Sequence, residues 1–113
     1  MQSDDIAPLR DMLYHAKKIA DRMCDVPLDQ YLNDEDLQWT VERLIEIIGE
    51  AARQVSSNFQ TTHPQIPWQK IVAQRHVIAH EYGEIDPELI WRVATVHIPT
   101  LIAELEPLIR DEA

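Results

Sequence analysis

Apolar residues recur at intervals of three and four along four segments of the chain, which is the spacing of one face of an α-helix. In the first segment, Asp4–Cys24, the pattern stops before Pro27, which cannot continue a helix. In the second segment, Asn33 is placed to cap a helix that extends to about Ser56. The faces predicted to be buried are Ile6, Leu9, Leu13, Ala16, Ala20 and Met23, then Leu37, Val41, Leu44, Ile48, Ala51 and Val55.

A polar segment separates these two helices from the second half of the chain. Ser57–Pro67 is rich in Ser, Thr, Asn, Gln and Pro, so we expect a loop there. Pro67 suits the first turn of a third helix, which we place at Trp68–Tyr82. Gly83 then offers a left-handed C-terminal cap.

A fourth helix should begin at Asp86, with a bend near Pro99 because proline removes a helical hydrogen bond. No strand-like alternation of Val, Ile and Thr is present. We therefore predict an all-α single domain over residues 1–113, an antiparallel up-down four-helix bundle with or without one short extra helix. The buried face predicted for the last helix is Leu89, Val93, Val96, Leu101, Leu105 and Leu108.

Composition indicates a soluble cytoplasmic protein. No apolar run approaches the roughly 20 residues of a membrane span, and the acidic start of the chain does not resemble a signal peptide. Cys24 is the only cysteine, which excludes an internal disulfide and a cysteine-based zinc site. Because it extends an apolar helical stripe, we expect Cys24 to be a small buried residue.

Charge is distributed unevenly along the chain. The formal net charge is −10, which argues against nonspecific nucleic-acid binding over the whole surface. All 20 acidic residues nevertheless lie outside positions 51–80, a stretch that carries arginine, lysine and histidine. It is either part of an uneven solvated surface or a local site for an anion such as phosphate. In the second case Arg75 would line a positive cleft, with Lys70 or Arg53 as further candidates.

Polar residues of the third helix share one arc of its surface. At about 100° per residue, with Arg75 at zero, Tyr82 lies near −20°, Ala79 near 40°, His76 near 100° and His80 near 140°. The small side chain of Ala79 would leave a shallow opening between the guanidinium and the imidazoles. Arginine suits phosphate, and histidine exchanges protons near neutral pH, so these groups supply what phosphodiester cleavage needs without a metal or other cofactor.

Arg75, His80 and Tyr82 form an R-x4-H-x-Y pattern that resembles the motif of HEPN domains, in particular HepT toxins paired with minimal nucleotidyltransferase antitoxins. The resemblance covers about Leu37–Ile109. The family often has Asn after the motif arginine, whereas this chain has His76, which can transfer a proton where Asn can only hydrogen-bond. Further similar segments are Ile47-Ile48-Gly49-Glu50-Ala51-Ala52, Pro64-Gln65-Ile66-Pro67-Trp68, Glu84-Ile85-Asp86 and Pro99.

The resemblance implies a ribonuclease toxin whose active unit is a homodimer, with RNA as substrate and a cognate nucleotidyltransferase antitoxin as partner. It implies that His80 is the general base toward the ribose 2′-OH and that Arg75 stabilises the transition state. His76 would orient the phosphate or act as general acid. Tyr82 would position the substrate or the arginine, and is the candidate acceptor of AMP from the antitoxin.

Other interpretations of the same residues stay open. Arg75 and Tyr82 could pack at the rim of the core, and His76 and His80 have the spacing of a metal-binding pair but no well-placed third ligand. The tryptophans are expected to be core or interface anchors. Two other function classes are a catalytically inactive nucleotide-binding or scaffold partner of a nucleotidyltransferase, and a purely structural helical dimer.

Overall fold

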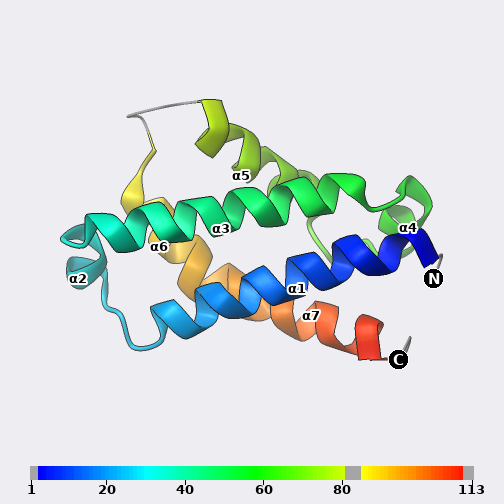
Figure 1. Ribbon diagram of the computed structural model, residues 1–113, viewed down its shortest axis with the longest axis horizontal. Helices are drawn as coiled ribbons and strands as arrows, with labels where there is room; N and C mark the ends of the chain where they lie inside the picture. The colour runs from blue at the N-terminus through cyan, green and yellow to red at the C-terminus, as the bar shows by residue number, and fades with distance from the viewer. Residues whose placement is uncertain (1–2, 81–84, 111–113) are drawn as a thin grey trace.

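Every element of the described chain is helical, as the apolar spacing predicts. The computed structural model describes residues 3–80 and 85–110, and for residues 3 and 75–80 it describes the backbone alone. Consecutive long helices run in alternating directions (Figure 1). The elements are α1 (Ser3–Met23), α2 (Leu28–Leu32), α3 (Glu35–Gln54), α4 (Ser57–Thr62), α5 (Trp68–His80), α6 (Pro87–Arg92), the π-helical turn η1 (Val93–His97) and α7 (Ile98–Arg110).

The core forms where α1 packs against α3 and α7, and α3 packs on its other side against α5. The predicted buried face of α3 is confirmed, except that Leu37 is only half-buried. In α1 the buried face is shifted, because Met12 and Ile19 are fully buried whereas Leu13 and Ala20 are half-buried. None of the described helices is both long and apolar enough to cross a membrane.

Two short helices lie outside the four segments predicted to be helical. Tyr31 is fully buried in α2, and Phe59 of α4 is buried within the expected loop. The predicted Asn33 cap is wrong, because Asp34 caps α3 by accepting a hydrogen bond from the Leu37 N–H at 3.0 Å. Asn33 instead ends α2, with its side-chain amide donating to a backbone carbonyl.

The start of α1 is fixed to the junction between α3 and α4 by a buried carboxylate. Asp5 is 1% exposed and accepts hydrogen bonds at 2.8 Å from both the backbone N–H and the hydroxyl of Ser56. The same Ser56 hydroxyl caps α4 by accepting from the Phe59 N–H. One serine thus joins the ends of two helices to a third. Cys24 lies beyond the last residue of α1 and is exposed, so its predicted burial is wrong.

The last predicted helix is interrupted before Pro99. At the end of η1 the Ile98 N–H donates to the Val93 carbonyl, five residues back, which is the π-helical pattern. A wide turn is one way for a helix to accommodate the ring and the missing N–H of a proline. The interruption expected near Pro99 therefore takes the form of a π-helical turn.

Around this wide turn, the side chains that are buried differ from those predicted. Leu89 and Val96 were expected in the core but are 45% and 53% exposed. The physical reason is that the interrupted helix turns a different set of side chains inward. The buried positions are Ile90, Ala94, Ile98, Leu101 and Leu105, which include two successive steps of four residues through the π-helical turn.

Trp68 anchors the start of α5. Its indole is 6% exposed, its Nε1–H donates to the His63 carbonyl at 3.0 Å, and its ring meets the Phe59 ring edge to face with 6.1 Å between centroids. The His63 imidazole stacks on the Phe59 ring, with 3.9 Å between the two ring centroids. This aromatic cluster fixes where α5 leaves the α4 segment.

We expect Trp68→Phe to lower the free energy of unfolding by about 1–3 kcal/mol, because it leaves a carbonyl without its donor and removes buried volume. Urea unfolding followed by circular dichroism measures the loss. Trp39→Phe is the matched control, since Trp39 is 61% exposed on α3 and its replacement should change stability by less than about 0.5 kcal/mol. Equal losses in the two variants would contradict the anchoring role.

Candidate functional site

The predicted motif falls on the C-terminal half of α5. The backbone is helical through Arg75, His76 and His80, so Arg75 and His76 lie on one turn of the helix and His80 lies on the next. Their side chains lie outside the described part of the structure, and so does the whole of Tyr82. The roles assigned to these four residues stay predictions.

The register of α5 relates the motif to the buried side of the helix. Trp68 is buried, whereas Gln69 and Ala73 are exposed. At about 100° per residue, position 75 returns to within about 20° of Trp68. Positions 76 and 80 each fall within about 20° of Gln69. The motif positions thus span the boundary between the buried and exposed sides of α5.

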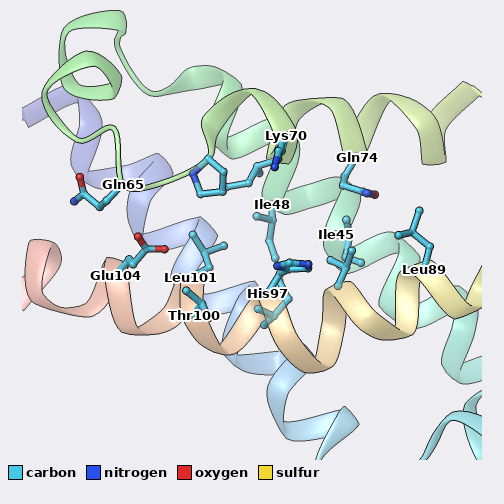
Figure 2. Close-up of a pocket in the computed structure, with 14 residues that line it drawn as sticks. Ile45, Ile48, Gln65, Lys70, Gln74, Leu89, His97, Thr100, Leu101 and Glu104 are labelled. Atoms are coloured by element: carbon cyan, nitrogen blue, oxygen red, sulfur yellow. The ribbon is translucent and has the colours of Figure 1, made fainter.

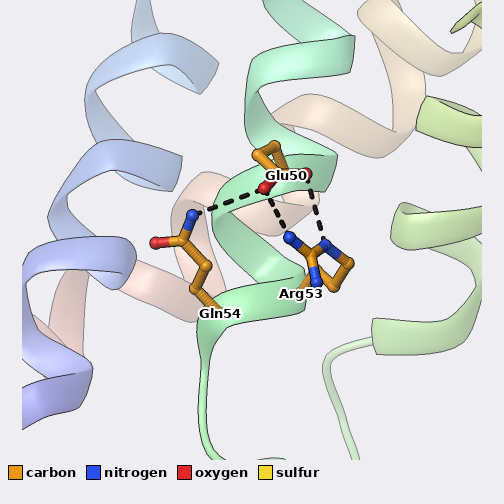
Figure 3. A network of polar contacts seen from close by, with 3 residues as sticks. All are labelled: Glu50, Arg53 and Gln54. Atoms are coloured by element: carbon orange, nitrogen blue, oxygen red, sulfur yellow. Dashed lines mark hydrogen bonds and ion pairs between the residues drawn. The ribbon is translucent and has the colours of Figure 1, made fainter.

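Beside α5, the end of α3 carries a small polar network (Figure 3). Glu50 accepts from Arg53 Nη2 at 2.7 Å and Nε at 3.3 Å, and from Gln54 Nε2 at 3.4 Å. The hydrogen bond to Glu50, together with its charge, raises the pKa of the Arg53 guanidinium above its usual value. Because the Glu50 carboxylate pairs with the Arg53 guanidinium and offsets its positive charge, Arg53 is a poor candidate for lining the predicted positive cleft.

Lys70, the other candidate for that cleft, lines a cavity to which Arg53 does not contribute (Figure 2). This cavity has a volume of about 390 Å³ and lies between α3, α5 and the η1–α7 segment. We call it the α5–α7 pocket. Its lining residues are Ile45, Ile48, Gln65, Pro67, Lys70, Ile71, Gln74, Leu89, Val93, His97, Ile98, Thr100, Leu101 and Glu104.

Sequence reasoning missed this pocket. Leu89 and Val93 were expected to be core residues, but they line the pocket together with His97. The sequence did contain a sign that the predicted buried face was irregular. That face steps by five residues from Val96 to Leu101, which no single helical face accommodates. As for metals, no group of three or more His, Cys, Asp or Glu side chains within the described residues could hold an ion.

Comparisons with known proteins agree with the motif. The model of the family described as ribonuclease HepT-like matches residues 5–108. A protein of Methanocaldococcus jannaschii named "Putative RNase" is 34% identical over 110 residues, 97% of this chain and 91% of the relative. A "Probable ribonuclease HepT" of Thermococcus cleftensis is 30% identical over 100 residues, 88% of this chain and 91% of the relative. No solved structure matches the chain.

The family model covers nearly the whole chain, and the full-length relatives carry the same kind of name. A helical chain with an R-x4-H-x-Y pattern, whose arginine and histidine positions lie on one helix, agrees with both findings. The chain therefore belongs to the ribonuclease HepT-like family and is an enzyme of the ribonuclease class.

Proposed function

We propose that this ribonuclease is the metal-independent endoribonuclease toxin of a toxin–antitoxin pair, of the type VII-like kind in which a nucleotidyltransferase neutralises the toxin. The observation that carries the proposal is the family match over residues 5–108, combined with the R-x4-H-x-Y pattern. The absence of acidic residues from positions 51–80 supports it, because no carboxylate precedes Arg75 in that stretch or separates it from His80 to repel RNA phosphates, and the nearest acidic residue along the chain is Glu81.

In the proposed reaction, His80 removes the proton from a ribose 2′-OH. The 2′ oxygen then forms a bond to the adjacent phosphorus, the bond from phosphorus to the 5′ oxygen breaks, and a 2′,3′-cyclic phosphate remains. The leaving 5′ oxygen takes a proton from His76 or from water. Arg75 donates hydrogen bonds to the phosphate oxygens, which carry additional negative charge in the transition state.

The proposal extends to the assembly. One copy of the motif offers few catalytic groups, and an isologous interface along α5 would bring in a second copy. The active unit would be a homodimer with RNA in a shared cleft. The alternating directions of the long helices support the antiparallel four-helix bundle of the HEPN type as the scaffold of each protomer.

We expect His80→Ala and Arg75→Ala each to lower RNA cleavage by about a hundredfold or more, because proton transfer and charge stabilisation each contribute on that scale. Growth inhibition should be lost with cleavage. His15→Ala is the control, since His15 lies on α1 and bonds only the local Asp11 carbonyl within the described structure. His76→Asn, the commoner family residue, should retain substantial activity.

The measurement is cleavage of a labelled RNA, with circular dichroism to check the fold of each variant. If all of the motif variants cleave as fast as the wild type, the assigned roles are wrong. If the wild type binds RNA without cleaving it, the chain is instead a catalytically inactive binding partner.

Tyr82 is the proposed acceptor of AMP from the antitoxin. After incubation with the cognate nucleotidyltransferase and ATP, we expect the intact mass of the wild type to increase by whole AMP units and that of Tyr82→Phe to stay unchanged. Tyr14→Phe is the matched control, because Tyr14 is 58% exposed on α1 and should leave AMP addition as in the wild type. Equal addition to the wild type and Tyr82→Phe would exclude Tyr82 as the acceptor, and no addition to the wild type would leave neutralisation to binding alone.

A further inference from the structure

The α5–α7 pocket combines an apolar floor with a polar rim. Ile45 and Ile48 of α3 form the floor together with Ile71 of α5 and Leu101 of α7. Figure 2 shows Lys70 and Gln74 above this floor, with other polar side chains below them on the η1–α7 side. Its volume of about 390 Å³ falls within the roughly 300–1,000 Å³ of small-molecule sites.

The polar side chains around the pocket are available to a ligand. In the described part of the structure, none of Gln65, Lys70, Gln74, His97 and Glu104 makes a hydrogen bond or ion pair with another side chain or with the backbone. Their chemistry is mixed, because the amides both donate and accept hydrogen bonds whereas lysine offers only a positive charge and donors. A ligand with an apolar face, a donor and acceptor edge and a negative charge would use all of them.

The backbone around the pocket is also unusual. The π-helical turn η1 supplies Val93 and His97 to its wall, and such turns occur frequently at functional sites. Within the described residues, α3 is the only element against which α5 packs extensively, so α5 and α7 leave the pocket open between them. Leu89 of α6 also lines the pocket and stays 45% exposed.

We propose that the α5–α7 pocket binds a nucleotide of the RNA substrate next to the cleaved bond. A base would lie on the isoleucine and leucine floor, its edge would bond the Gln65 and Gln74 amides, and Lys70 would meet a phosphate. A fatty acyl chain would leave both amides unused, whereas the donor groups of a base can bond the amides and the carboxylate of Glu104 while its phosphate meets Lys70. A nucleotide is the ligand that matches the whole rim.

The position of the pocket along α5 fits this assignment, which rests on the proposed function. Ile71 lines the pocket, and Arg75 lies one helical turn later, an advance of about 6 Å along the axis. For comparison, a single OB-fold domain binds about 4–16 nucleotides of a single strand. One short RNA segment could therefore reach both the pocket and the motif.

The test uses two variants that alter the pocket and two matched controls on the same helices. Gln74→Ala removes one amide and Thr100→Trp fills the pocket, whereas Gln69→Ala and Ala103→Trp change exposed positions outside it. We expect the KM for cleavage of a tetranucleotide to rise about tenfold in the two pocket variants, because one bound base contributes on that scale. The kcat should stay within about twofold, and both controls should behave as the wild type.

Direct binding separates failure of this proposal from failure of the ribonuclease assignment. Nucleoside 5′-monophosphates are titrated into the full chain and followed by amide chemical shifts, with loss of binding expected in Thr100→Trp and not in Ala103→Trp. If the wild type cleaves RNA and the pocket variants match it in both experiments, the pocket does not bind RNA and the proposal is overturned. If the wild type cleaves nothing, the titration alone decides whether the pocket takes a nucleotide.

A third result would also overturn the proposal. If Thr100→Trp, but not Ala103→Trp, changes the oligomeric state measured by sedimentation and leaves monophosphate binding as in the wild type, the pocket holds a protein surface. Circular dichroism of every variant checks that the helical fold is kept.

Discussion

The attachment of α5 to α3 is the contact on which the positions of both proposed sites depend. Trp68 holds the start of α5 through its buried indole and the hydrogen bond to the His63 carbonyl. From there the helix packs extensively against α3 alone among the described elements. One side of α5 therefore borders the open pocket, while the later turns carry the motif positions. A single helix thus links the proposed chemistry to the proposed recognition of a base.

The parts of the fold that sequence could predict are those in which one helix buries one continuous face. The α3 stripe from Val41 to Val55 was predicted correctly because its spacing is regular and its neighbours on both sides are apolar. The short helices α2 and α4 were missed because each is held by one buried aromatic residue, Tyr31 or Phe59, rather than by a repeating pattern. Capping was misplaced by one residue because Asn33 and Asp34 are both good caps.

The error in the last helix has a physical cause that also bears on function. Leu89 and Val93 match a helical core pattern, but the π-helical turn before Pro99 brings Ile90, Ala94 and Ile98 inward instead. Leu89 and Val93 then line the α5–α7 pocket. For the predicted motif the sequence supplies the candidates, because the R-x4-H-x-Y spacing singles out Arg75, His80 and Tyr82 where the structure describes no side chains; the family match covers this stretch but assigns these residues no roles.

The central claim is that a helix without acidic residues, on an otherwise acidic protein, cleaves RNA by attack of a 2′-OH without a metal. The most direct measurement is the chemistry of the product ends, obtained in excess chelator with a substrate that carries one cleavable bond. The account predicts a 2′,3′-cyclic phosphate and a 5′-hydroxyl, and no cleavage when the 2′-OH at that bond is replaced by hydrogen. Cleavage of the deoxy substrate, or 5′-phosphate ends formed only when a divalent metal ion is added, would contradict it.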